Sequence, residues 1–248
     1  MKRNHPESWQ HLIPVKTKEG NKYTYGHATI YAAPKMTGAT NLAASACARM
    51  GVGLVSVLAQ TDMANTYRMI LPAHIIVRDD LEWTDQRVTA RLYGSGGLSI
   101  APDYTSNLPI VLDADALKKL PETLAPNYIL TPHEGEFERA FPDIKGTPME
   151  RALEASKQIN AHVVLKGAIT IIAAPNGAYV VNECLAPCLA TAGTGDVLAG
   201  MITGLVAQKM PIFEACCAAT WIHGECGKTF GTGLVASDLV DLIPKIII

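Results

Sequence analysis

A glycine-rich turn before an expected helix carries the residues best suited to chemistry. Gly193, Thr194 and Gly195 precede Asp196 in the segment LATAGTGDVLAG. The first amide groups of a helix have no partners within it, and together with the helix dipole they bind anions such as phosphate. A carboxylate beside a bound phosphate can accept the proton of a hydroxyl that attacks phosphorus. The pattern indicates a phosphate site with Asp196 as base, although a carboxylate in a first helical turn also fits a simple cap.

Charged residues follow other apolar segments as well, where parallel strands would end. Lys166 comes directly after the apolar residues 163–165. A lysine at the carboxyl end of a strand can reach a phosphate in the crevice where α/β sheets bind ligands; an ordinary solvated lysine is the alternative. Two further groups follow other segments, namely Asp113 with Asp115, and His133 with Glu134 and Glu136. The second group suits the positioning of a ligand or of a phosphate-bound Mg²⁺.

The sequence predicts that strands alternating with helices position these residues. Short apolar segments rich in β-branched residues predict buried strands at 28–33, 53–59, 74–77, 109–114, 128–131, 162–166, 170–174 and 178–182. Helix-like segments at 39–50 and 148–161 lie between some of them, which indicates an α/β layer architecture. The turn Pro-Asn-Gly at 175–177 separates the last two strands and predicts an antiparallel hairpin at the sheet edge.

The C-terminal part of the chain predicts three helices. They cover residues 196–208, 213–230 and 237–246, and Ser237 is the expected N-cap of the last one. The first two carry apolar or small residues on nearly all faces. Such helices are buried, either in the core of the protein or against another subunit.

Composition excludes several classes of protein. The 248 residues include 21 Lys+Arg and 23 Asp+Glu without blocks of charge, so no basic surface for nucleic acid is expected. The apolar stretches are too short to span a bilayer, and the polar start lacks a signal core. The six cysteines show neither disulfide nor metal spacing and are expected to be structural thiols. We therefore expect one cytoplasmic domain over residues 1–248, without a membrane anchor.

Several segments, taken in order, resemble the ADP/ATP-dependent NAD(P)H-hydrate dehydratase family of the ribokinase-like superfamily. They are TGATNLAASACARMGVGLVSV, GSGG, VLDADAL, ILTPHEGEF, VVLKGAITII and LATAGTGDVLAGMITGL. The resemblance implies a ribokinase-like three-layer α/β/α fold, with a mostly parallel central sheet and an antiparallel edge hairpin. It also implies a single domain without the N-terminal epimerase domain of the fused family members.

The resemblance further implies an activity. Hydrated NADH or NADPH is phosphorylated on its ring hydroxyl by ATP or ADP with Mg²⁺, and elimination then restores the cofactor. Neither the choice of donor nor the preferred hydrate follows from the sequence. The resemblance implies that Asp196 is the base and that Gly193, Thr194 and Gly195 form an anion hole for the transferred phosphate. It implies that the nucleotide binds to Lys166, Gly167, Ala168, Ile169, Thr170 and Gly195, and that the hydrate contacts Ala39, Gly96, His133 and Asp196. Glu136 would help to organise Mg²⁺ through the phosphates. A homo-oligomer, with a tetramer favoured, is implied as well.

The chain departs from the family pattern in the region before residue 110. Residues 32–34 read Ala-Ala-Pro where the family has a double-glycine turn, and residues 94–98 read GSGGL where it has GPGLG. Only about ten residues separate Leu98 from Pro109, where the family has a crossover helix, so we expect either a different local strand order or a crossover without a helix. These departures favour one alternative, a catalytically impaired member that serves as a nucleotide-binding or assembly subunit. A second alternative is a related thiazole- or pyrimidine-alcohol kinase.

Overall fold

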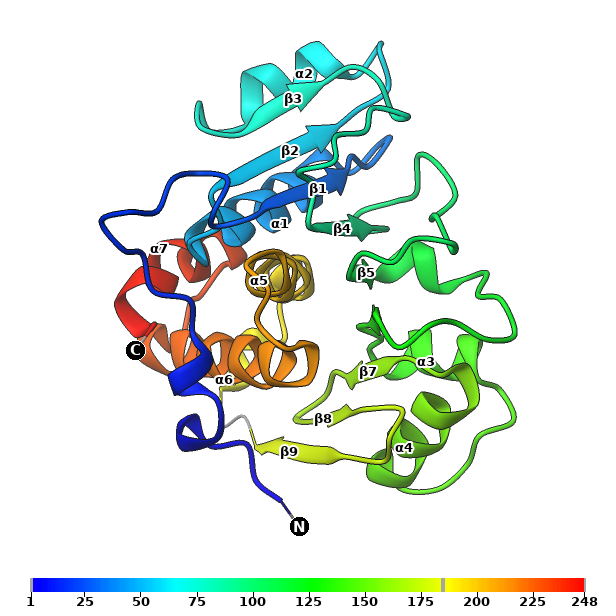
Figure 1. Ribbon diagram of the computed structural model, residues 1–248. Helices are drawn as coiled ribbons and strands as arrows, with labels where there is room; N and C mark the ends of the chain where they lie inside the picture. The colour runs from blue at the N-terminus through cyan, green and yellow to red at the C-terminus, as the bar shows by residue number, and fades with distance from the viewer. Residues whose placement is uncertain (1, 184–185, 248) are drawn as a thin grey trace.

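A nine-stranded sheet forms the centre of the computed structural model, which describes residues 2–183 and 186–247 (Figure 1). The strand order is β3-β2-β1-β4-β5-β6-β7-β8-β9. All pairs from β3 to β7 are parallel, and β8 is antiparallel to both of its neighbours. The strands are β1 (His27–Tyr31), β2 (Leu54–Leu58), β3 (Ile76–Arg78), β4 (Ala90–Tyr93), β5 (Ile110–Leu112), β6 (Tyr128–Leu130), β7 (His162–Leu165), β8 (Ile169–Ala173) and β9 (Tyr179–Glu183).

Helices cover the two faces of this sheet (Figure 1). One face carries α1 (Thr37–Arg49), α2 (Ala64–Ile70), α5 (Thr194–Ala207), α6 (Ile212–Phe230) and α7 (Ala236–Ile246). The other face carries α3 (Glu134–Ala140) and α4 (Pro148–Ile159). Four short 3₁₀ helices complete the elements, at Pro6–Ser8, Gln10–Leu12, Ala114–Leu117 and Pro187–Leu189. The expected three-layer α/β/α architecture is confirmed.

The buried strands arise from their continuous apolar sequences. All residues of β1, β5, β6 and β7 are buried, because helices or loops lie on both faces of the sheet. The expected antiparallel hairpin is formed by β8 and β9, with Gly177 in a left-handed conformation at φ +86° in the turn. The sheet order reverses between β1 and β4, and such a reversal opens a crevice at the carboxyl ends of the strands.

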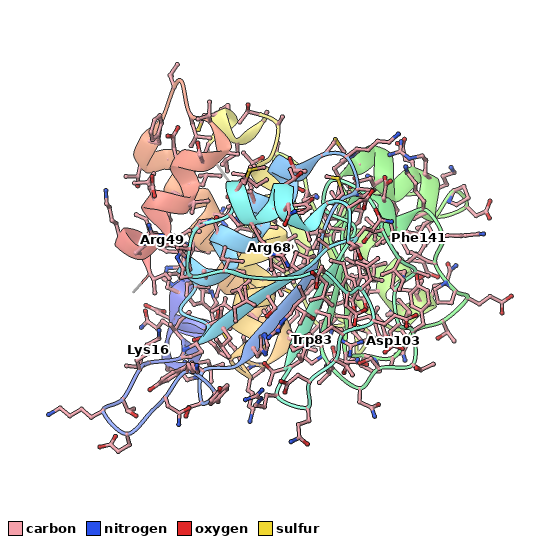
Figure 2. All side chains as sticks on the ribbon, turned by 90° about the horizontal axis from the view of Figure 1, so that it is seen from above. Lys16, Arg49, Arg68, Trp83, Asp103 and Phe141 are labelled. Carbon is pink, nitrogen blue, oxygen red and sulfur yellow. The ribbon has the colours of Figure 1, made fainter. Side chains whose placement is uncertain are left out.

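The crossover from β4 to β5 contains no helix, and the parallel strand order is kept. Residues 94–109 cross the sheet as an extended loop instead. Asp103 anchors this loop, because its carboxylate lies 3.1 Å from Arg91 Nη1 and its carbonyl accepts a 2.7 Å hydrogen bond from the Tyr128 hydroxyl. Trp83, from the loop between β3 and β4, and Tyr104 pack against the hydrophobic cluster on the face of the sheet that carries α3 and α4 (Figure 2 labels Trp83 and Asp103). Of the two expectations, the crossover without a helix is the one observed.

Some expectations from the sequence were incomplete or wrong. Strand β4 and helices α2 and α3 were not predicted. Ser237 is not the N-cap of α7, which begins at Ala236; the N–H of Val235 donates to Asp238 Oδ2 at 2.9 Å and starts the helix instead. Helices α5 and α6 are buried as expected, and α1 and α7 supply their cover within the chain.

The cysteines in the described part of the chain are free thiols. Cys47, Cys216, Cys217 and Cys226 are buried and Cys188 is half-buried, as structural thiols should be, while Cys184 lies outside the described residues. Within residues 2–183 and 186–247, every helix is too short or too polar to cross a lipid bilayer.

Candidate active site

Lys166 lies at the centre of a polar cluster at the carboxyl edge of the sheet. It follows β7, and its Nζ atom lies 3.1 Å from Asp113 Oδ1 and 3.9 Å from Glu136 Oε2. Its side chain is only 18% exposed, so it is not a freely solvated lysine. A Cβ added at Gly195 would lie 3.1 Å from this Nζ, which places the ammonium group beside the first turn of α5. A glycine at that position leaves room for the lysine.

Asp113, at the end of β5, is the most buried acid of the cluster. Its side chain is 3% exposed and accepts hydrogen bonds from Ser95 Oγ at 2.9 Å and Thr131 Oγ1 at 2.8 Å, besides the contact with Lys166. A buried carboxylate requires such donors. The other acid of this pair, Asp115, lies outside the cluster, because it pairs with Lys118 at 2.6 Å. Of the two acids that the sequence pattern singled out, Asp113 belongs to the polar cluster and Asp115 lies at the surface.

Asp196 lies in the first turn of α5 beside this network. Burial raises the pKa of its carboxyl to about 6; the charge of Asp113 also raises it, whereas Lys166 and the Ser95 hydroxyl lower it. A carboxylate whose pKa lies close to the working pH can both accept and release a proton. Asp196 is thus a buried carboxyl with a raised pKa and not a solvated helix cap.

The start of α5 presents its amide groups without a capping side chain. Gly193 occupies the N-cap position at φ +89°, which only glycine adopts readily. The Thr194 hydroxyl donates to the carbonyl of Leu189 at 2.8 Å. His223 Nε2 lies 2.9 Å from the Thr194 carbonyl, and burial lowers the pKa of this histidine to about 4, so the neutral ring donates here. These contacts fix a helix start that is open to an anion.

The expected nucleotide segment forms the turn between β7 and β8. Lys166, Gly167 and Ala168 connect the strands, and Ile169 and Thr170 begin β8. Ile169 is half exposed at the edge, whereas Thr170 is buried and donates to the Gly167 carbonyl at 3.4 Å. Through Lys166 this turn lies beside the start of α5.

The expected substrate residues Ala39 and Gly96 lie against each other. A Cβ at Gly96 would come within 2.5 Å of Ala39 Cβ, so only glycine allows this approach. A Cβ at Gly97 would lie 3.1 Å from Pro34 Cδ. The Ala-Ala-Pro turn at 32–34 is therefore accommodated by Gly97, the third glycine of the GSGG segment, and the two segments pack against each other.

His133 and Glu136 cap α3 at the same edge of the sheet. The His133 N–H donates to Glu136 Oε2 at 2.9 Å, and the Glu136 N–H donates to His133 Nδ1 at 3.3 Å. The Lys166 N–H donates to the Pro132 carbonyl at 2.8 Å, which holds this cap beside the lysine. Glu134 was expected in the same cluster, but its carboxylate instead accepts two hydrogen bonds from Arg151 on α4.

The cluster does not form a preassembled metal cage. The Glu136 carboxylate is engaged by the His133 N–H and faces Lys166, and Asp113 has three donors. In the described part of the chain, no group of three or more His, Cys, Asp or Glu side chains is arranged to hold a metal ion. Mg²⁺ fits this site only as an ion that nucleotide phosphates and water carry, which is its usual mode of binding.

Three polar residues of the site were missed from the sequence. Ser95 and Thr131 hold Asp113, and His223 holds Thr194. A signal existed for two of them, because Ser95 lies inside the GSGG turn and Thr131 directly precedes the Pro-His-Glu segment. His223 lies in the middle of an apolar helix, where nothing in the local sequence separates it from a core residue.

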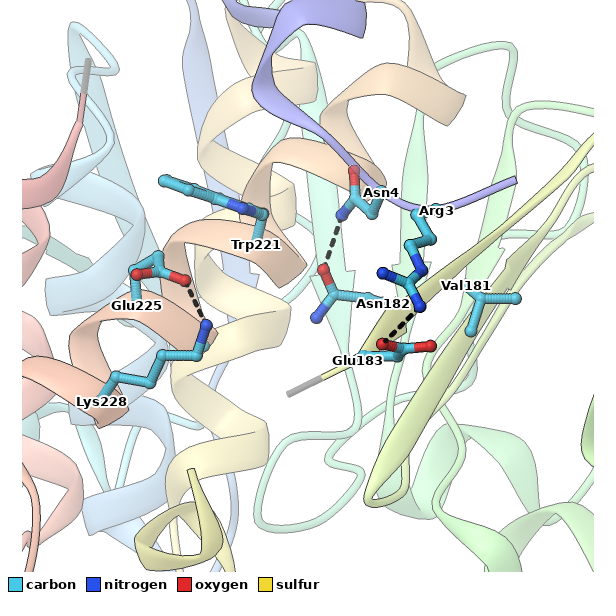
Figure 3. Close-up of a pocket in the computed structure, with 9 residues that line it drawn as sticks. Arg3, Asn4, Val181, Asn182, Glu183, Trp221, Glu225 and Lys228 are labelled. Atoms are coloured by element: carbon cyan, nitrogen blue, oxygen red, sulfur yellow. Dashed lines mark hydrogen bonds and ion pairs between the residues drawn. The ribbon is translucent and has the colours of Figure 1, made fainter. Parts of the chain in front are cut away.

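A separate hollow of about 140 Å³ lies between β9 and α6 (Figure 3). Two ion pairs flank it, Arg3 with Glu183 at 3.6 Å and Lys228 with Glu225 at 2.6 Å. None of the residues expected from the sequence to act in catalysis or binding lines it. The polar cluster around Lys166 is thus a different place, at the strand ends from β4 to β7.

Comparison with known proteins identifies relatives of this chain. The family model for NAD(P)H-hydrate dehydratase matches residues 30–248. The chain is 34% identical to the ADP-dependent (S)-NAD(P)H-hydrate dehydratase of Neisseria meningitidis serogroup B, over 92% of this chain and 87% of that protein. It spans about half the length of the bifunctional NAD(P)H-hydrate repair enzymes that it also matches.

Solved structures share the fold. The ADP/ATP-dependent NAD(P)H-hydrate dehydratase from Bacillus subtilis, co-crystallised with ATP/Mg²⁺, superposes with a TM-score of 0.85 at 29% identity, over 99% of this chain and 97% of that one. A ribokinase-like superfamily protein from Enterococcus faecalis, 20% identical, superposes with a TM-score of 0.87 over 100% of this chain and 95% of that one. The fold is ribokinase-like, and the chain belongs to the NAD(P)H-hydrate dehydratase family.

Proposed function

We propose that the protein dehydrates hydrated NADH or NADPH with ATP or ADP as phosphodonor. The observation that carries this proposal is the convergence of Asp196 and Lys166 at the uncapped start of α5, in a chain of this family. A base, a cation and free amides are the groups that phosphoryl transfer to a hydroxyl requires.

The proposed reaction begins at Asp196. Its carboxylate accepts the proton of the ring hydroxyl while the hydroxyl oxygen attacks the terminal phosphorus, whose bond to the leaving nucleotide breaks. The amides of Gly193, Thr194 and Gly195 and the ammonium of Lys166 neutralise the charge on the transferred group. The phosphate then leaves the ring carbon, and a proton leaves the neighbouring ring carbon, which restores the double bond of the dihydropyridine.

The two ligands would approach the cluster from different elements. We propose that the turn formed by Lys166, Gly167, Ala168, Ile169 and Thr170 binds the nucleotide, because it borders the anion-binding start of α5. Ala39 and Gly96, which lie against each other, and His133, which follows the Pro132 carbonyl that accepts from the Lys166 N–H, would contact the hydrate. Mg²⁺ would arrive on the phosphates and neutralise part of their charge, with Glu136 near it but not as a required ligand.

The alternatives have less support. A catalytically impaired subunit was favoured by the altered turn at residues 32–34 and the short crossover, but Gly97 accommodates the first and Asp103 anchors the second. The base and the lysine are both present beside the helix start. A thiazole- or pyrimidine-alcohol kinase would share this machinery, and the family match argues against it.

The direct test supplies hydrated NADH with ATP or ADP and Mg²⁺ and follows the recovery of NADH absorbance. We expect recovery that depends on the nucleotide and disappears in Asp196→Asn, which keeps the shape of the side chain but cannot accept the proton. Hydrated NADPH, compared in the same assay, gives the substrate preference. Nucleotide binding without any recovery, with either donor, would identify the protein as an impaired binding subunit.

We also propose that the chain acts as one domain in the cytoplasm and as a homo-oligomer, with a tetramer favoured. The free thiols of the described cysteines fit a reducing compartment. The oligomer has weaker support, because α1 and α7 already cover α5 and α6 within the chain. Light scattering of the purified protein measures the oligomeric state directly.

A further inference from the structure

We propose that His223 is a positioning residue for the Gly195 amide, one of the three amides that would bind the transferred phosphoryl group. The histidine lies on α6, far along the chain from the helix start on which it acts. The inference rests on the proposed function, which gives the Gly195 N–H its role in charge neutralisation. It adds a residue of α6 that no motif in the sequence assigned to this site.

A single peptide unit joins the histidine contact to the Gly195 amide. His223 Nε2 lies 2.9 Å from the Thr194 carbonyl oxygen, and this carbonyl belongs to the same peptide as the Gly195 N–H. Peptide bonds are trans throughout the described part of the chain. In a planar trans peptide the C=O and N–H groups point in opposite directions. The hydrogen bond on the carbonyl side therefore sets the direction of the Gly195 N–H on the other side.

The ring of His223 is suited to hold this peptide permanently. A carbonyl oxygen only accepts hydrogen bonds, so Nε2 carries the proton in this contact. Burial lowers the pKa of the ring to about 4, and the positive charge of Lys166 acts in the same direction, so the ring is neutral at neutral pH. The side chain is 8% exposed, so little water can compete for the Thr194 carbonyl.

The remaining contacts of this peptide are few. The Thr194 hydroxyl donates to the Leu189 carbonyl at 2.8 Å, which holds the threonine side chain but not the plane of the peptide that follows it. Gly193 and Gly195 flank the threonine, so the backbone on both sides lacks the restraint of a Cβ. Without His223, the Thr194 carbonyl keeps only the N–H four residues later in the helix.

The histidine also strengthens the amide as a donor. A hydrogen bond to a peptide oxygen polarises the peptide and increases the positive charge on its N–H. The Gly195 amide lies beside Lys166, because a Cβ at Gly195 would be 3.1 Å from the lysine Nζ. Loss of His223 should therefore weaken an anion contact next to the ammonium group. Lys166 itself would keep its partners Asp113 and Glu136.

The test compares His223→Leu, which occupies the space but donates nothing, with His223→Gln, whose side-chain amide can still donate. His162→Leu is the matched control. His162 is also buried with its pKa lowered to about 4, but it lies at the opposite end of β7 from Lys166. In the dehydratase assay we expect kcat to fall about 10-fold in His223→Leu, to stay within about 3-fold of the wild type in His223→Gln, and to be unchanged in His162→Leu.

A second measurement does not depend on turnover. ¹⁵N–¹H NMR follows the assigned Gly195 amide while the protein is titrated with ADP and Mg²⁺. Binding of a phosphate oxygen should shift the Gly195 proton downfield in the wild type and in His223→Gln. At saturation we expect the shift in His223→Leu to be about half as large, because the N–H is less well aligned and less polarised.

The outcomes separate the two proposals. A wild-type kcat in folded His223→Leu overturns the role of His223, as does a loss of kcat that His162→Leu shares. Equal Gly195 shifts in His223→Leu and His223→Gln, or no Gly195 shift in the wild type, overturn it as well. If His223→Leu does not fold, His223→Ala carries the same comparison. If the wild-type protein has no dehydratase activity, the proposed function fails, while the Gly195 titration still decides the inference about His223.

Discussion

Lys166 Nζ lies 3.1 Å from Asp113 Oδ1, although the strands that the two residues follow are separated in the sheet by β6. The lysine side chain thus extends along the carboxyl edge of the sheet, past β6, to the end of β5. The contact fixes the ammonium beside the start of α5. A preset cation of this kind requires little reorganisation when phosphate charge develops.

Replacing Lys166 by alanine should weaken nucleotide binding. Removal of the buried cation eliminates its attraction for the phosphates, and we expect the Kd for ADP to rise at least about 10-fold. Isothermal titration calorimetry on the folded variant measures this directly. Lys118→Ala is the matched control, because Lys118 pairs with exposed Asp115 outside the cluster and should leave the affinity unchanged. Equal affinities in both variants would remove Lys166 from the nucleotide site.

The catalytic rate should fall on the acid side with the titration of Asp196. Since the base must be ionised, and burial raises its pKa to about 6, kcat/KM should decrease tenfold per pH unit below about pH 6. The pH profile of NADH recovery, measured at low substrate concentration, tests this. A profile that stays flat down to pH 5 would show that the group that takes the proton is not Asp196.

The raised pKa of Asp196 also predicts that its ionised carboxylate lowers the free energy of unfolding at neutral and alkaline pH. The folded state binds the Asp196 proton more tightly than the unfolded chain, whose carboxyl has the ordinary value of 3.8. Its contribution to stability is therefore full below that value and is lost as the pH rises through about 6. Asp196→Asn carries no charge and should exceed the wild type in unfolding free energy by about 2 kcal/mol at pH 8.

Urea unfolding of both proteins at pH 8 and pH 5 measures the difference. The advantage of Asp196→Asn should shrink at pH 5, where the wild-type carboxyl is largely protonated. Lys166 keeps Asp113 and Glu136 as partners in the variant, so no buried cation is left unpaired. A variant that is less stable than the wild type at pH 8 would contradict this account of the burial of Asp196.

The sequence patterns predicted most strands and pointed to several residues that the structure brings together in the polar cluster, because both depend on local composition. Buried parallel strands are continuous apolar segments, and the site residues follow them at their carboxyl ends. Strand β4 was missed because it has only four residues and contains Arg91, whose charge Asp103 compensates only in the folded chain. Glu134 pairs with Arg151 outside the polar cluster, whereas Asp113 accepts from Ser95 within it. Because both partners lie far away in sequence, no local pattern distinguishes these two acids.

The loop that joins β4 to β5 without a helix should unfold locally more easily than the helices that cover the sheet. The Tyr128 hydroxyl and Arg91 both anchor Asp103, so Tyr128→Phe removes one of the two contacts that hold Asp103. We expect a loss of about 1 kcal/mol in unfolding free energy and faster cleavage within residues 98–108 during limited proteolysis. Tyr104→Phe, which removes a more exposed 3.2 Å hydrogen bond to the Lys119 carbonyl, should have a smaller effect.

Two buried histidines should make the fold less stable in mild acid. Burial lowers the pKa of both His162 and His223 to about 4, against an ordinary value of 6.5. Between these values the unfolded chain binds more protons than the folded one, so stability falls as the pH falls from 6.5 toward 4. Each histidine lowers the free energy of unfolding by about 2 kcal/mol between pH 7 and pH 5, and protonation of Asp196 offsets about 1 kcal/mol of the total.

His223→Gln keeps an N–H donor for the Thr194 carbonyl but does not titrate. This variant should therefore reduce the pH dependence of urea unfolding by the contribution of one histidine. An unchanged pH dependence in that variant would mean that His223 is already charged, or already accessible to water, in the folded protein.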